Sequence, residues 1–182
     1  MVAKMLTKPE CGWTDFKIDE EHTYGLGYLT DVALDWLDQA IHGLTEIAPF
    51  TVHGFCEPGR MLCTVSYWDC YIMMEDEDGE GVYEFHGVKL NMIDFCKALY
   101  QDISKDIDAW VRWDVSSLDD SYCSMECNID NCDNGIHCIM DEEDFINPLF
   151  DWRKGLIQEK LDVLKELIDK NEEHFCPNRA FF

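Results

Sequence analysis

The sequence predicts an α+β domain: an antiparallel sheet of about three to five strands, arranged as a β-meander, with about three helices packed against it. Between residues 50 and 90, stretches rich in β-branched and aromatic residues alternate with turn signals. Amphipathic stretches with a 3.6-residue period lie before and after them. Strands in series with helices gathered around them are typical of this class, and helices on one face of a sheet would leave the other face free to meet a partner.

The length and composition are those of one folded domain. A chain of 182 residues can bury a substantial core, and 47% hydrophobic with 13% aromatic residues argues against disorder despite a formal net charge of −24. We therefore expect a single domain over residues 1–182. Within it we expect an irregular, acidic, cysteine-rich segment at residues 116–143, where neither a helix period nor a strand period is present.

The first strand and the first helix are expected before residue 46. Residues 13–18 alternate in polarity, which favours a strand. Thr30 or Asp31 can cap a helix that runs to about Thr45, because either side chain can accept a hydrogen bond from a free backbone N–H of the first turn. The apolar positions of this helix share one face: Ala33, Trp36, Leu37, Ala40, Ile41 and Leu44.

The sheet is expected between residues 50 and 90. Residues 50–56 predict an extended segment, and residues 57–60, Glu-Pro-Gly-Arg, predict a tight turn. Residues 61–74 predict one long central strand. Residues 75–81 hold five acids and two glycines and predict a solvated hairpin tip, after which residues 82–90 return as a third strand.

Two more helices follow. Asn91 can cap a helix that ends near Trp110, with Asp94 three residues after the cap. Residues 110–115 predict a short edge strand. Asn147 and Pro148 are expected to open the last helix, because proline suits a first helical turn, and residues 176–177 to end it. The apolar stripe of this last helix is Leu149, Leu156, Ile157, Leu161, Leu164, Leu167 and Ile168.

The charge balance indicates which classes of partner the protein is expected to bind. With 38 acids against 14 lysines and arginines, the chain repels polyanions, which disfavours direct binding to nucleic acid or to anionic lipid. It favours a basic protein, although a solvated acidic surface explains the same composition. The first residues hold no signal-peptide pattern and no apolar run reaches the length of a membrane span, so we expect a cytoplasmic protein, in the host cell if a phage encodes it.

Two acidic segments are the predicted partner-binding residues. No lysine or arginine occurs between Trp113 and Trp152, a window with eleven carboxylates. Charges of one sign on a rigid sheet edge can imitate the phosphates of a duplex, which are spaced about 1.7 Å per charge along its axis. The predicted interface is Glu75, Asp76, Glu77, Asp78 and Glu80 on the hairpin tip, with Asp119, Asp120, Asp141, Glu142, Glu143 and Asp144 from the second segment.

The cysteines suggest one possible metal site. Cys123, Cys127, Cys132 and Cys138 lie within 16 residues, and four thiolates satisfy the tetrahedral preference of zinc. Their spacing is not that of a zinc ribbon, and a loop with free thiols is the alternative. A second group, namely Cys56, Cys63, Cys70, Cys96 and Cys176, lies in or beside apolar stretches and is expected to behave as small buried hydrophobes.

No motif for catalysis is present in the sequence. It contains no nucleophile elbow, no phosphate-binding glycine loop and no zinc-protease helix motif. His53 is close to Cys56, and His86 could face Cys63 or Cys70 across a hairpin, but nothing specifies a third group to orient the base. We therefore expect a protein that is not an enzyme and has no cofactor, unless zinc is bound.

Three short stretches carry a resemblance, namely Leu29-Thr30-Asp31 at a helix entry, Pro49-Phe50-Thr51-Val52, and Glu57-Pro58-Gly59 before a strand. Through them, residues 29–113 resemble small bacterial domains of the toxin-immunity kind. In size, acidity and lack of catalytic motifs the chain also resembles anti-CRISPR proteins, which inhibit RNA-guided nucleases. These resemblances imply an acidic inhibitor that blocks the nucleic-acid-binding surface of a nuclease. An immunity protein for a nuclease toxin is the first alternative, and a zinc-stabilised domain or cysteine-dependent enzyme is the second.

Overall fold

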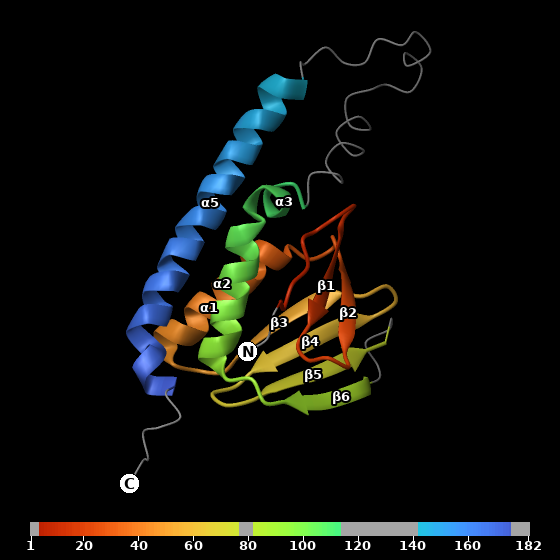
Figure 1. Cartoon of the computed structure of the whole chain (residues 1–182). Coiled ribbons are helices and arrows are strands. Elements are labelled where there is room, and N and C mark those ends of the chain that lie inside the picture. The colour runs from red at the N-terminus through yellow and green to blue at the C-terminus, as the bar shows by residue number, and fades with distance from the viewer. Residues whose placement is uncertain (1–3, 77–81, 114–141, 176–182) are drawn as a thin grey trace.

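The computed structural model describes residues 4–76, 82–113 and 142–175 (Figure 1). Two antiparallel sheets and four helices within these ranges confirm the α+β class. In chain order the elements are β1 (Trp13–Lys17), β2 (Thr23–Gly27), α1 (Val32–Glu46), β3 (Phe50–Phe55), β4 (Arg60–Val65), β5 (Cys70–Glu75), β6 (Val82–Val88), α2 (Met92–Lys105), α3 (Ile107–Val111), α5 (Glu142–Asn171) and the short 3₁₀ helix η2 (Glu172–Phe175). None of the helices described here is both long enough and apolar enough to cross a bilayer.

The larger sheet is the predicted meander. Strands β3, β4, β5 and β6 pair in that order, each antiparallel to the next. Burial alternates along β3, β4 and β5, as a half-buried sheet requires. Val52, Cys63 and Ile72 point into the core, whereas Leu62 and Met73 are only half-buried on the opposite face.

The hairpin of β1 and β2 lies on the buried face of this sheet, beside α1 and α2 (Figure 1). Gly54 of β3 permits this close approach, because a Cβ at that position would lie 2.9 Å from a methyl carbon of Leu26 in β2. Trp36 of α1 is fully buried and packs edge-on against Phe16, and its indole N–H donates to the His53 carbonyl at 2.8 Å. The core therefore joins the hairpin, α1 and the sheet.

Helix α5 forms an outer layer along α1 and α2 (Figure 1). Its buried side chains Ile157, Leu161, Leu164 and Ile168 recur at helical spacing, as the apolar stripe predicts. Leu149, Leu156 and Leu167 of the predicted stripe are only half-buried. At the end of the helix the Asn171 amide donates to the carbonyl of Leu44 in α1 at 3.1 Å.

The predicted long strand over residues 61–74 is wrong. It is two strands, β4 and β5, joined by a turn in which the Ser66 N–H donates to the Asp69 carbonyl at 2.9 Å. Tyr67 and Trp68 at the centre of this turn have high strand propensity, which hid the turn signal of Ser66 and Asp69. Strand β2 was also missed in the sequence, because two of its five residues are glycines.

Two predicted boundaries in the second half are also wrong. The structure describes residues 110–113 of the predicted edge strand, and they do not form a strand. Trp110 and Val111 belong to α3, which follows α2 after a break at Asp106. Helix α5 begins at Glu142, so Pro148 lies inside it rather than at its start. The proline ring allows a helical φ, but at the seventh position of the helix it removes one backbone hydrogen bond and crowds the carbonyl four residues earlier, so it disfavours the helix there.

Candidate functional site

Acidic residues lie on the β1–β2 turn, on the β3–β4 turn and at the end of β5. Strand β4 starts at Arg60, which pairs with both Phe55 and Glu75, so the β3–β4 turn and the end of β5 are neighbours. The β1–β2 turn reaches the adjacent strand, because His22 stacks on His86 of β6 with ring centroids 3.9 Å apart. We define the acidic sheet end by its described members: Asp19, Glu20, Glu21, Glu57, Glu75 and Asp76.

The cations beside the acidic sheet end are already paired. Arg60 donates from Nε to the Glu75 carboxylate at 2.8 Å, and Lys17 lies 3.9 Å from Asp15. Glu20, Glu21, Glu57 and Asp76 are exposed. Carboxylates in excess on turns of a sheet produce a local negative potential.

Some acids on the helices are paired with lysines. Lysines of α5 pair with Asp108 of α3 at 2.7 Å, with Asp169 of α5 at 3.1 Å and with Asp38 of α1. Lys97 of α2 pairs with Glu172 at 2.5 Å. Other helix acids, among them Glu46, Asp151, Glu159 and Glu166, are exposed, so surplus negative charge lies on the helices as well as on the sheet turns.

Asp19 is held in an ionised state by its own turn. Its Oδ1 accepts from the backbone N–H groups of Glu21 at 2.9 Å and His22 at 2.7 Å, and its Oδ2 lies 2.9 Å from His22 Nδ1. Burial on its own would raise the pKa of Asp19, but the hydrogen bonds from the side chain and backbone of His22 and from Glu21 outweigh it, so the pKa is lowered.

The structure brings together only part of the predicted interface. Glu75 and Asp76 lie at the acidic sheet end, whereas Glu77, Asp78, Glu80, Asp119, Asp120 and Asp141 are outside the described residues. Glu142, Glu143 and Asp144 occupy the first turn of α5, where only the backbone is described. Figure 1 shows α5 beginning beyond α3, away from strands β5 and β6.

Asp19, Glu20, Glu21 and Glu57 were missed in the sequence. The run Asp19-Glu20-Glu21 is a visible acidic turn signal between residues 18 and 22. Its position beside β6 depends on how the β1–β2 hairpin packs on the sheet, which no local pattern specifies.

The structure describes only some of the cysteines singled out in the sequence. Cys123, Cys127, Cys132, Cys138 and Cys176 lie outside the described residues. Cys63, Cys70 and Cys96 are fully buried free thiols, as predicted, and Cys56 is half-buried. A hydrogen bond from the Cys63 thiol to Cys70, together with burial, raises the pKa of Cys63 well above its usual value, and burial raises the pKa of Cys96. Thiols held neutral in this way are inert, which fits a packing role.

The two cysteine–histidine pairs considered for catalysis do not meet in the contacts found. His86 stacks on His22, and its Nδ1 lies 3.2 Å from the Tyr24 hydroxyl. The Cys56 thiol donates to the Gly54 carbonyl at 3.7 Å. Burial raises the pKa of Cys56, which disfavours the thiolate that nucleophilic chemistry needs.

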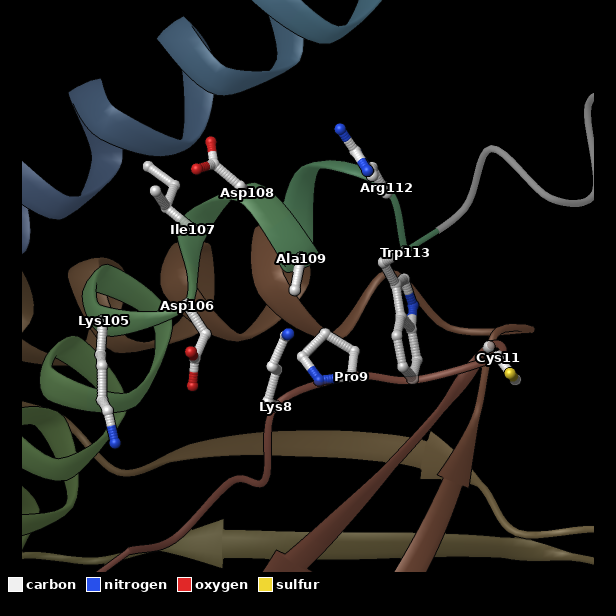
Figure 2. Close-up of a pocket in the computed structure, with 11 residues that line it drawn as sticks. Lys8, Pro9, Cys11, Lys105, Asp106, Ile107, Asp108, Ala109, Arg112 and Trp113 are labelled. Atoms are coloured by element: carbon white, nitrogen blue, oxygen red, sulfur yellow. The ribbon is translucent and has the colours of Figure 1, made fainter.

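A cavity of about 540 Å³ lies between the N-terminal segment and α3 (Figure 2). Its lining mixes charges of both signs and includes Lys8, Lys105 and Asp106 together with the exposed thiol of Cys11. Figure 2 shows Cys11 and Lys105 at opposite ends of the lining and Arg112 pointing away from it. The Arg112 guanidinium instead lies 5.8 Å from the ring centre of Phe150. The charges do not converge on one point, so the lining does not define a ligand.

Comparisons with known proteins found no relative of this chain. No protein-family model, no curated protein and no solved structure matches the chain.

Proposed function

We propose that the protein is a non-enzymatic inhibitor that binds a basic, nucleic-acid-binding protein through its acidic sheet end. The observation that carries this proposal is a set of exposed carboxylates on turns of the sheets. These are Glu20 and Glu21 on the β1–β2 turn, Glu57 on the β3–β4 turn and Asp76 at the end of β5.

The physical argument is one of charge complementarity. A lysine- and arginine-lined channel attracts the acidic sheet end over several ångströms, which speeds association at low salt. A close interfacial charge pair can couple by roughly 1.5–7 kcal/mol, so a few well-placed carboxylates suffice. The hydrogen-bonded sheet holds the turns in place before binding, which reduces the entropy lost on association.

The partner class that fits this chemistry is a nuclease with a groove for nucleic acid. An RNA-guided DNA nuclease is our leading partner, and a nuclease toxin is the second. Both present cations arranged for a phosphate backbone, so the acidic sheet end would compete with the nucleic acid for the same groove.

The test begins with a panel of guide-loaded RNA-guided nucleases and nuclease toxins, each assayed for DNA cleavage with increasing amounts of the protein. We expect inhibition of at least one panel member, relieved by excess substrate DNA because the two compete. A pull-down from the source cell at low and at high salt extends the panel. Inhibition that excess DNA does not relieve would contradict competition for the groove.

Two variants with equal charge change localise the interface. The first neutralises the acidic sheet end through Glu20→Gln, Glu21→Gln, Glu57→Gln and Asp76→Asn. The control neutralises exposed helix acids through Glu46→Gln, Asp151→Asn, Glu159→Gln and Glu166→Gln. We expect the first variant to need at least tenfold more protein for half inhibition, and the control to match the wild type. An equal loss in both would show that net charge alone matters.

A further inference from the structure

Three ligand-type side chains converge where the β1–β2 turn meets β6. One ring nitrogen of His22, one ring nitrogen of His86 and a carboxylate oxygen of Asp19 all lie within 4.8 Å of one another. The His22 side chain is 34% exposed and that of Asp19 is 28% exposed, so an ion from solvent could reach them. His22 and His86 are 64 positions apart in the sequence, and packing of the hairpin on the sheet brings them together.

The spacing of these atoms is close to that of a metal coordination shell. Zinc binds histidine nitrogen and carboxylate oxygen at about 2.0–2.2 Å, which places two tetrahedral ligands roughly 3.4 Å apart. The separation of 2.9 Å between Asp19 Oδ2 and His22 Nδ1 is already short enough. The imidazoles of His22 and His86 are stacked at an interplanar angle of 20°, so one ring has to rotate out of the stack for both lone pairs to reach a common ion.

The surroundings favour a cation at this place. Two backbone N–H groups fix the position of the Asp19 carboxylate. The Tyr24 hydroxyl contacts His86, in the position of an outer-shell group that orients a ligating ring. Glu20 and Glu21 are exposed in the same turn and add negative potential.

We propose that Asp19, His22 and His86 bind a divalent transition-metal ion of the zinc type. Two imidazoles favour such an ion over magnesium or calcium, which prefer oxygen ligands. Three protein ligands leave a position for water. The bound ion would tie the β1–β2 turn to β6 next to the acidic sheet end. The proposed metal site does not depend on the proposed partner, and its ligands include none of the cysteines at residues 123–138.

The test uses full-length protein stripped of metal by a chelator and titrated with Co²⁺ as a spectroscopic probe, then with Zn²⁺ in competition. We expect one equivalent to bind with visible absorption of a nitrogen and oxygen site and without thiolate-to-cobalt charge transfer. The paramagnetic ion should broaden the imidazole proton signals of His22 and His86 in the wild type, a readout that needs no variant. Binding should weaken at acidic pH, because the ion competes with protons for imidazole.

Variants then assign the ligands. His22→Ala and His86→Ala should each weaken Zn²⁺ binding at least tenfold, while His42→Ala, at an exposed position of α1, should not change it. Replacing Cys123, Cys127, Cys132 and Cys138 by Ser should leave this binding intact. No binding to the wild type, binding unchanged in both histidine variants, or binding abolished by the four serines would each overturn the proposal.

Discussion

At the scale of single residues, Asp102 shows how one buried carboxylate organises a terminal segment. It lies on α2 and is 9% exposed, and its Oδ2 accepts from the backbone N–H groups of Met5 at 2.7 Å and Leu6 at 2.8 Å. Met5 and Leu6 are themselves fully buried. Without this acceptor, two buried donors would lose their partners.

Asp102→Ala should therefore destabilise the fold far more than Asp102→Asn. Each donor left unsatisfied costs about 1–3 kcal/mol, whereas the asparagine carbonyl can still accept from the same two N–H groups. The free energy of unfolding from urea titration at neutral pH measures both variants. If the alanine variant were as stable as the asparagine variant, the two hydrogen bonds would not fix the terminal segment.

The same residue predicts a pH dependence. Burial raises the pKa of Asp102 above its ordinary value of 3.8, and the backbone hydrogen bonds from Leu6 and Met5 and the nearby Lys4 and Lys105 only partly offset this. A raised pKa means that the folded state binds the proton more tightly. The resulting stabilisation is complete below pH 3.8 and is lost as the pH rises through the folded-state pKa.

Relative to Asp102→Asn, which does not titrate, the wild type should therefore gain stability as the pH falls from 7 towards 4. Urea titrations of both proteins across this range measure the difference, and effects common to both cancel. A difference that stays constant over the range would show that Asp102 has an ordinary pKa in the folded protein.

At the scale of elements, an ion pair joins the start of α1 to α5. Arg153 is 7% exposed and donates to both carboxylate oxygens of Asp31, at 2.5 Å and 2.9 Å. Asp31 also caps α1 by accepting from the Leu34 N–H at 3.2 Å. One side chain thus begins a helix and neutralises a buried cation.

Asp31→Asn should separate these two roles. Asparagine is an equally good cap, but it leaves the Arg153 charge buried without its counter-ion, and breaking a buried pair costs roughly 3–5 kcal/mol. Adding Arg153→Met should restore part of the loss, because the unpaired charge is removed. Urea unfolding of both single variants and the double variant measures the coupling. If the double variant were as unstable as the sum of the single variants, the pair would have no coupling.

The elements also show how far the sequence determines the fold. Helices α1 and α2 were predictable because a capping side chain, Asp31 or Asn91, precedes a clear apolar period. Strand β2 was not, because Gly25 and Gly27 lower the strand propensity of a segment of five residues.

The sequence predicted part of the candidate site. Glu75 and Asp76 were assigned to a solvated hairpin tip from sequence alone. The proximity of Asp19 and His22 to His86 depends on how the β1–β2 hairpin packs on the sheet. Contacts between positions this far apart in the chain follow from tertiary packing and leave no periodic signal.

At the scale of the whole molecule, a net charge of −24 should make the fold sensitive to salt. Between about 0.01 M and about 1 M salt the Debye length falls from about 30 Å to about 3 Å, which screens repulsion among the surplus carboxylates. We expect the urea midpoint to rise with sodium chloride concentration. Lower stability at high salt would instead mean that the ion pairs of the helices outweigh this repulsion.

The proposed function requires that the surplus charge at the acidic sheet end drives binding to the partner. The most direct measurement is the association rate constant with the partner as a function of salt, for the wild type and for the two charge-matched fourfold variants. We predict that the sheet-end variant associates at least tenfold more slowly at low salt and with a shallower salt dependence, while the helix variant follows the wild type. Identical rate constants and salt slopes for all three proteins would contradict the claim.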